Sequence, residues 1–397
     1  MTSDNNLYDF ILFENFHSAF HHKIDVYLIA RLLKSKGLKV AILNIYGEDK
    51  QDDYSEIELL DLPFSDNIPN DKSWVESKDN NIKRLFYVIR FLNQQARYMK
   101  KVYDFIQDKA VRFYVGSYHL VMPAVFMKLN KPCYYWGLRS YRMTGFGRLF
   151  KKNPFLAFRM IYLKKRFIKN EYQSLFVSNN IIKTEFVALG VPEKRLVLRE
   201  ERCIEKKEEY NHEVKDKQFS LLVIGGLRRQ KHVETTIEAF KNAKLSEGVL
   251  RLVGENKDID YERVILDRLA ESSNIERING KLDYMAFNEY LRRAHFTLFA
   301  DEKGASSVTN GTMMESVINY TPIIAPDYDP YSFYVKKYGL GLLYKPGDIK
   351  SYSEAIKKAY KIGYGSFVEK IKEFHKTIEF DVVANQLFDG IMNNEQK

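Results

Sequence analysis

The sequence predicts an α/β protein made of two Rossmann-like domains that face a central cleft. Short apolar stretches alternate with helical patterns in both halves of the chain, which is typical of parallel sheets covered by helices. A highly charged stretch over 203–218 separates the two halves and is interpreted as an interdomain linker. The chain of 397 residues is also too long for a single domain with one hydrophobic core, because a domain usually contains roughly 100–200 residues.

The first half begins with a strand–helix–strand unit. The apolar run 8–13 is followed by a helical pattern that ends at Gly37, and a second strand covers 38–45. Further strands are expected at 111–118, 131–138 and 174–180, with helical patterns at 119–130 and 181–190. This order predicts a parallel sheet in an N-terminal, Rossmann-like domain over residues 1–205.

The second half repeats the alternation after the charged stretch. Its strands and helices are expected in the segments 219–230, 233–243, 249–256, 261–273, 274–280, 284–294, 295–300 and 339–348, with a final helix from Ser351. We expect a C-terminal, Rossmann-like domain over residues 206–380. The last helix, 381–397, is expected to pack back on the N-terminal domain.

Composition narrows the class of protein. Two cysteines, Cys133 and Cys203, provide neither a disulfide framework nor the spacing of a metal site. The N-terminus lacks a signal peptide and no run reaches ~18 apolar residues, so we expect a cytoplasmic protein. The net charge of +10 favours an anionic partner. Charge alone does not separate nucleic acid, anionic lipid and phosphorylated small molecules.

A glycine turn, GGLRRQK, follows the first strand of the second half. Gly225 and Gly226 allow a ligand to approach the backbone, and Arg228, Arg229 and Lys231 can meet a phosphate at the end of the strand. The alternative is an ordinary strand–turn–helix whose cations are only solvated.

The segment SVTNGTMMESVINYTPIIAPD, residues 307–327, combines a helix start with an acid. Gly311 and Thr312 lie where the helix begins, and the N–H groups of a helix start form an anion site. Glu315 lies one turn further along, where its carboxylate can accept hydrogen bonds from sugar hydroxyls. The alternative is a capped helix in which Glu315 only complements the helix dipole.

Together these segments resemble the GT-B glycosyltransferases, especially the retaining glycosyltransferase family 4-like group, also called glycosyl transferases group 1. The stretch 223–240 resembles the family's turn with Gly-Arg-Leu, three residues and Lys-Gly, and 311–327 resembles its helix that carries a glutamate. The segments 176–200, 250–256 and 274–300 resemble the family's intervening elements. The resemblance covers most of residues 174–345, and the first half is similar in layout only.

The resemblance implies that the second domain, 206–380, binds a nucleotide-sugar donor and that the first domain, 1–205, binds the acceptor. Lys231, with Arg228 or Arg229, would neutralise the leaving diphosphate, where charge develops in the transition state. Glu315 would hold the ribose. The donor-binding residues expected on this basis are Gly225, Gly226, Arg228, Arg229, Lys231, Gly254, Ser307, Asn310, Gly311, Thr312 and Glu315. No cofactor and no metal are expected.

Three positions depart from the family pattern. Gly226 stands where the family usually has arginine, and Ser307 stands where it has the acid that meets the donor sugar. Asp301 and Glu302 are candidates to replace that acid. The family's histidine place falls on 136–137, a Trp-Gly pair, so His119 is the candidate active-site histidine, beside Arg229 and Lys231 as catalytic residues.

Other polar clusters carry weaker hypotheses. His17, His21 and His22 could contact an acceptor or a metal, but no acid spacing supports a metal site. The Asp-Tyr-Asp sequence at 327–329 resembles the metal motif of a different glycosyltransferase fold, and its position before a proline predicts a turn.

Two segments of the first half, 83–101 and 148–169, mix basic and aromatic residues. Such faces suit an anionic membrane surface, so we expect peripheral contact with the cytoplasmic face of a membrane. The alternatives are a solvated helix face and a nucleic-acid patch.

The sequence therefore predicts an enzyme that moves a sugar from a nucleotide-diphosphate-sugar donor to a glycan or lipid-linked acceptor. The family implies a hexosyltransferase with a retaining outcome and a place in surface polysaccharide or glycoconjugate biosynthesis. Two alternatives stay open: a non-catalytic nucleotide or nucleic-acid binding protein on the same scaffold, and a nucleotide-sugar epimerase of similar shape.

Overall fold

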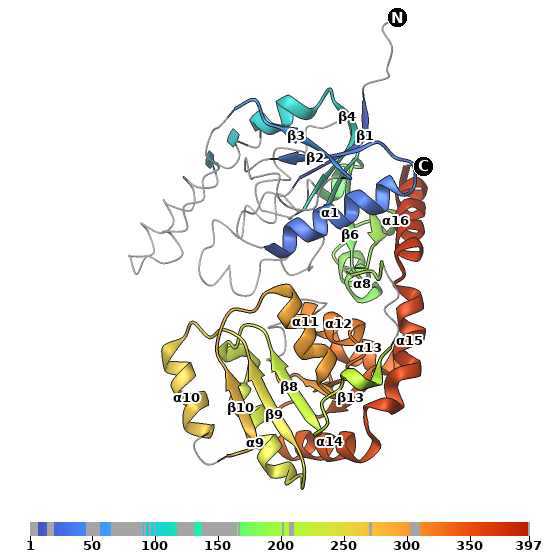
Figure 1. Ribbon diagram of the computed structural model, residues 1–397. Helices are drawn as coiled ribbons and strands as arrows, with labels where there is room; N and C mark the ends of the chain where they lie inside the picture. The colour runs from blue at the N-terminus through green and yellow to red at the C-terminus, as the bar shows by residue number, and fades with distance from the viewer. Residues whose placement is uncertain are drawn as a thin grey trace, which may run out of the picture. The chain divides into compact units, whose positions relative to one another are not determined.

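The structure is a computed structural model with two compact units (Figure 1). It describes residues 7–13, 20–44, 56–64, 90, 93–94, 97–98, 100–116, 131–136, 165, 167–200, 202–205, 210–269, 272–301 and 310–395. Unit 1 consists of Met1–Glu201 and Phe380–Lys397, and unit 2 of Arg202–Glu379. The chain thus passes from unit 1 to unit 2 and back.

Unit 1 contains a seven-stranded parallel sheet in the order β3-β2-β1-β4-β5-β6-β7. Its strands are β1 (Tyr8–Phe13), β2 (Val40–Asn44), β3 (Glu58–Asp61), β4 (Ala110–Val115), β5 (Cys133–Trp136), β6 (Gln173–Val177) and β7 (Leu196–Leu198). Helices α1 (Phe20–Lys34) and α8 (Asn180–Ala188) flank it. Strands β5 and β6 are buried along their whole length, as is typical of strands inside a parallel sheet.

The C-terminal helix α16 (Phe380–Glu395) packs on unit 1, against α1 and β7. Near its end, Glu395 accepts hydrogen bonds from Arg112 Nε at 2.6 Å and from the Tyr134 hydroxyl at 3.0 Å. Asn394 Nδ2 donates to Ser174 Oγ at 2.8 Å. Residues from the two ends of the chain therefore share one folded unit.

Unit 2 contains a six-stranded parallel sheet in the order β10-β9-β8-β11-β12-β13. Its strands are β8 (Ser220–Ile224), β9 (Val249–Val253), β10 (Ile275–Ile278), β11 (Phe296–Leu298), β12 (Ile323–Pro326) and β13 (Gly341–Tyr344). Its helices are α9 (Val233–Ala243), α10 (Ile259–Leu269), α11 (Tyr284–Arg293), α12 (Gly311–Ile318), α13 (Tyr331–Tyr338), α14 (Ile349–Ile362) and α15 (Val368–Thr377). The strand order reverses between β8 and β11, and ligands of such sheets bind at the carboxyl ends of strands beside that point.

The charged stretch 203–218 is not a free linker where it is described, and this prediction was wrong. Ile204 N donates to Ile378 O at 2.8 Å, and Lys215 is buried with its ammonium on Ala294 O at 2.7 Å and Thr321 Oγ1 at 2.8 Å. The chain enters unit 2 at Arg202, earlier than the expected boundary after residue 205. Partners far away in the sequence bury these charges, so local composition does not reveal them.

Other elements also differ from the prediction. Strand β3 was not expected, since its sequence ELLD has no long apolar run. The helix expected from Ser351 is divided into α14 and α15, and the last helix expected over 381–397 corresponds to α16. The helical pattern at 119–130 lies outside the described residues. No helix in the described part of the chain is long and apolar enough to cross a membrane.

Candidate functional site

Two glycine turns meet at the carboxyl ends of β8 and β9. Gly225 has φ of +95° and Gly254 has φ of +128°, values that L side chains rarely adopt. Gly225 N donates to Val253 O at 3.1 Å, and a Cβ on Gly254 would overlap the carbonyl oxygen of Gly225. Glycine is therefore required at 254 for this close approach.

Lys231 and the start of α12 lie beside the first of these turns. A Cβ built on Gly225 would lie 3.4 Å from Lys231 Nζ and 3.7 Å from Thr312 Oγ1. The glycine, the ammonium and the hydroxyl thus line one small region, although 87 positions separate Gly225 from Thr312 (312 − 225). The structure thus places side by side two motifs that lie far apart in the sequence.

Lys231 is half-buried and donates from Nζ to Ile224 O at 2.9 Å. Burial lowers the pKa of the Lys231 ammonium, the negative charge of Asp301 opposes that shift, and the positive charge of Arg228 adds to it. The next residue, His232, has φ of +43° where the resembled family carries glycine. It leads directly into α9, so the left-handed turn fixes where Lys231 leaves the backbone.

Arg229 points away from this region. Its Nε lies 2.6 Å from Asp258 Oδ2, and its guanidinium lies over the Tyr261 ring at 5.3 Å from the centroid. This ion pair raises the pKa of Arg229 and lowers the pKa of Asp258. The structure therefore favours Arg228, whose charge reaches Lys231, over Arg229 as the second cation of the site.

The start of α12 is capped by Asn310, whose Oδ1 accepts a hydrogen bond from Met313 N at 3.3 Å. A Cβ on Gly311 would meet no atom within 4 Å, so open space adjoins the first turn. The first N–H groups of a helix have no partner within the helix, and together with the helix dipole they attract an anion. The start of α12 is thus capped and open on one side, and phosphate binding there stays a prediction.

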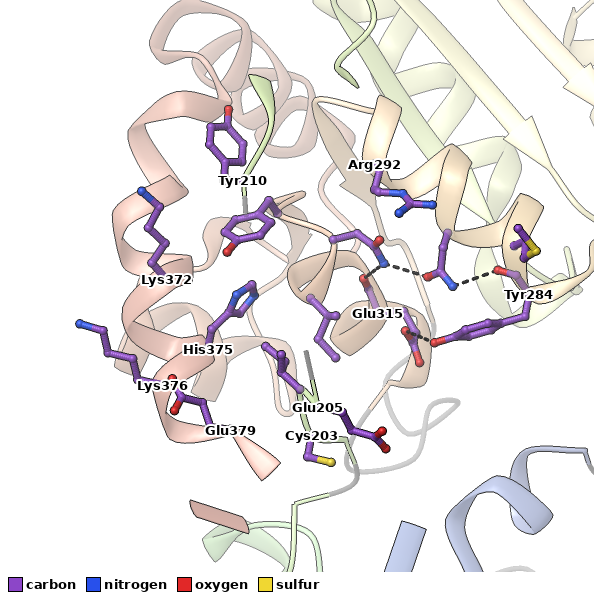
Figure 2. A pocket seen from close by; sticks show the side chains of 16 residues that line it. Cys203, Glu205, Tyr210, Tyr284, Arg292, Glu315, Lys372, His375, Lys376 and Glu379 are labelled. Atoms are coloured by element: carbon purple, nitrogen blue, oxygen red, sulfur yellow. Dashed lines mark hydrogen bonds between the residues drawn. The ribbon is translucent and has the colours of Figure 1, made fainter. Parts of the chain in front are cut away.

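Glu315 is buried in the second turn of α12 and is already paired. Its Oε1 accepts from Arg202 Nε at 3.0 Å, and the Tyr284 hydroxyl lies 3.4 Å from Oε2. Figure 2 shows Glu315 and Tyr284 pointing toward one another at a pocket of about 900 Å³. The sequence analysis missed Arg202 and Tyr284, because neither carries a local signal and both reach Glu315 only through the fold.

Several candidate residues lie outside the described part of the chain. These are Ser307, Glu302, His119, His17 and Gly137. His21 and His22 belong to α1, but their side chains are not among the described atoms, and most of 83–101 and 148–169 is likewise outside. Gly226 lies in the turn after β8, where a Cβ would lie 3.7 Å from Arg228 Nε.

The Asp-Tyr-Asp sequence caps α13. Asp327 accepts from Ser332 Oγ and Lys336 Nζ, both at 2.7 Å, and Asp329 accepts from Phe333 N at 3.2 Å. Their carboxylates serve the turn that the sequence predicted. Across the described residues, no group of three or more His, Cys, Asp or Glu side chains could hold a metal ion.

Comparisons with known proteins bear on this site. The chain is similar in structure to the lipopolysaccharide outer core galactosyltransferase WaaB (TM-score 0.62, 13% identity, covering 96% of this chain and 99% of that one). It is similar to WaaG, a glycosyltransferase involved in lipopolysaccharide biosynthesis (0.61, 16%, 96% and 98%), and to a glycosyltransferase from Rickettsia africae ESF-5 (0.68, 12%, 99% and 100%). Residues 205–377 match the family model of glycosyl transferases group 1. The chain is a GT-B glycosyltransferase.

The matched region of this glycosyltransferase lies within unit 2, which holds the glycine turns, Lys231 and Glu315. No curated protein matches the sequence. The α/β fold class, the GT-B architecture and the enzyme class predicted from the sequence are confirmed.

Proposed function

We propose that this glycosyltransferase takes a sugar from a nucleotide-diphosphate-sugar and transfers it to a glycan or lipid-linked acceptor. The observation that carries the proposal is the meeting of Gly225, Lys231 and Thr312 at the carboxyl ends of the strands of unit 2. A cation, a hydroxyl and a helix start around a glycine turn form a site for a diphosphate.

The position of Glu315 extends this site toward a sugar. Its carboxylate lies one turn along the same helix as Thr312, so a diphosphate at the helix start brings the adjoining ribose toward it. Arg202 and Tyr284 occupy part of its hydrogen-bonding capacity. A carboxylate has about four lone-pair positions, which leaves room for ribose hydroxyls.

The chemistry assigned to the site is stabilisation of the leaving group. Charge builds on the diphosphate as its bond to the sugar breaks, and the Lys231 ammonium with Arg228 offsets that charge in a partly dry site. No metal or cofactor is needed for that role. We assign a retaining, hexosyltransferase-type outcome by resemblance to the family, with His119 as the candidate active-site histidine.

Proteins of similar fold support a nucleotide donor. HepE from Anabaena has been crystallised with UDP and with UDP-glucose, and it aligns with 98% of this chain in both cases. WaaB and WaaG bear names that place them in lipopolysaccharide assembly, which supports a glycoconjugate acceptor and a place near a membrane surface.

A thermal-shift screen with UDP, GDP, ADP, CMP and their sugars tests the donor site. A ligand at about 100 times its Kd adds about 2.7 kcal/mol to the free energy of unfolding. We expect one base to stabilise the wild type, and Lys231→Ala and Glu315→Ala to weaken that shift. Lys257→Ala and Glu289→Ala are matched controls, because both side chains are largely exposed in unit 2.

The same screen can reject the proposal. A flat response of the wild type to every nucleotide would remove the donor-site assignment. Equal weakening by the control variants would show that the loss reflects general charge rather than this site. Release of free sugar or transfer to an acceptor extract, followed by mass spectrometry, then identifies the donor sugar.

A further inference from the structure

Asn310, the residue that caps the start of α12, belongs to a cluster of buried polar side chains. Asn310 uses its Oδ1 to cap the helix, while its Nδ2 donates to Asp301 Oδ2 at 3.3 Å and to the Tyr331 hydroxyl at 2.7 Å. The Tyr331 hydroxyl in turn donates to Asp301 Oδ2. The Asn310 side chain thus ties the first turn of α12 to Asp301, three residues after the end of β11, and to the start of α13.

Asp301 is the charged member of this cluster. Its side chain is 8% exposed, Asn310 is 9% exposed and Tyr331 is fully buried. The backbone carbonyl of Asp301 also accepts a hydrogen bond from the Tyr328 hydroxyl. Hydrogen bonds therefore hold both the backbone and the side chain of Asp301. They restrict the orientation of its carboxylate.

A buried carboxylate needs more than neutral donors. Taking an isolated charge out of water costs several kcal/mol, and hydrogen bonds from a tyrosine and an asparagine offset only part of it. The negative charge of Asp301 also acts on the ammonium of Lys231, in the turn after β8, where it opposes the lowering of the lysine pKa by burial. The other charged group that acts on Lys231 is Arg228, from the same turn as the lysine.

We propose that Asp301 is a positioning residue of the donor site, which it serves in two ways. Through Asn310 and Tyr331 it holds the start of α12 in register with the glycine turn, and its negative charge acts on the Lys231 ammonium. The inference rests on the proposed function, because it concerns the same diphosphate site. It differs from the sequence hypothesis in which Asp301 meets the donor sugar, since the carboxylate is engaged by the cap of α12.

The test is the pH dependence of nucleoside diphosphate binding, measured by calorimetry between about pH 6 and about pH 10. The probe is whichever of UDP, GDP and ADP the wild type binds. Affinity should fall at alkaline pH as Lys231 loses its proton. Asp301→Asn removes the charge that keeps the ammonium protonated, so the alkaline fall should move to lower pH. Asp301→Glu keeps the charge and should leave the fall near its wild-type position.

Three further variants separate positioning from general stability. Lys231→Arg should abolish the alkaline fall, because a guanidinium stays protonated over this range. Tyr331→Phe loses the two hydrogen bonds that the hydroxyl makes with Asn310 and Asp301 but no charge, so affinity should drop about fivefold with the pH of the fall unchanged. Tyr344→Phe is the matched control, a buried tyrosine bonded to Phe299 O at 2.9 Å, and should leave both quantities unchanged.

The outcomes are distinguishable. If Asp301→Asn, Asp301→Glu and wild type share one pH profile, or if Lys231→Arg keeps the alkaline fall, the positioning role is wrong while nucleotide binding stands. If Asp301→Asn does not fold, equal profiles for Tyr331→Phe, Tyr344→Phe and wild type, with equal affinities, overturn it. Failure of the wild type to bind any of the three diphosphates overturns the proposed function and this inference together.

Discussion

Two lysines of unit 2, one buried and one half-buried, lie at opposite ends of the same strand, β8. Lys215 precedes β8 and is 9% exposed, and its ammonium donates hydrogen bonds to Ala294 O and Thr321 Oγ1. Lys231 follows β8, is half-buried, and gives one hydrogen bond to Ile224 O beside a helix start. Burial lowers the pKa of both, but only Lys231 lies where a ligand can approach. We therefore propose a structural role for Lys215 and a ligand-binding role for Lys231 from their positions relative to the strand ends, rather than from residue type.

Lys231→Ala should have the largest effect on activity. Removing a charge that meets the transition state costs about a hundredfold to a thousandfold in kcat, as for other preorganised groups. Steady-state kinetics with the identified donor measure this loss, and the free energy of unfolding should change little. A variant that keeps more than half of the wild-type kcat would contradict the assignment.

Lys215→Ala should instead lower the free energy of unfolding and leave nucleotide binding unchanged. Two buried acceptors lose their donor, and the packing over the Tyr364 ring is lost, so we expect a loss of about 2 kcal/mol in the free energy of unfolding. Urea denaturation gives this value. Nucleotide affinity of the folded variant should equal that of the wild type, and a tenfold loss of affinity would argue against a purely structural lysine.

The pH dependence of stability should also identify Lys215. Burial lowers its pKa from 10.5 to about 7, so between these values the unfolded chain binds a proton that the folded chain does not. Stability should therefore rise with pH across this window, by up to about 1 kcal/mol per pH unit from this group. Lys215→Met should lack that contribution. Parallel stability curves for variant and wild type would show that the ammonium stays charged when folded.

The smallest effects should distinguish the two arginines of the turn. Arg228→Ala should weaken nucleotide binding about fivefold, because its charge acts in the region of Lys231. Arg229→Ala removes an exposed ion pair with Asp258 and should change binding by less than about twofold. The reverse ranking would show that Arg229 leaves Asp258 when a donor binds.

The sequence predicts the architecture well because apolar strands and helical patterns are local signals. The strands around Phe10 and Leu222 lie where such runs occur, and the glycine turn at Gly225 and the helix start at Thr312 have local signatures of their own. The cluster of Asp301, Asn310 and Tyr331 has no such signature, since its members are joined only when β11, α12 and α13 pack together. The partners of Glu315 were missed for the same reason.

For the charged stretch before β8, residues 203–218, a local signal was present but led to a wrong prediction. Its composition predicts a solvated linker, yet Asp216 pairs with Arg251 and with Arg293, and Lys215 bonds to a threonine that lies 106 positions away. Charge density is a local quantity, whereas burial depends on distant partners. Sequence patterns therefore locate turns and strands better than they locate buried ions.

The path of the chain through its two units has a consequence for the order of folding. Ile204 and Glu379 form a parallel bridge, so the entry and exit of unit 2 are fastened to each other. Unit 1 instead needs α16, and the contact between Arg112 and Glu395 closes a loop of 283 positions. On a ribosome, all of unit 2 is synthesised before the last helix of unit 1 exists. Synthesis therefore begins with unit 1, but unit 1 can complete its fold only after all of unit 2 has been made.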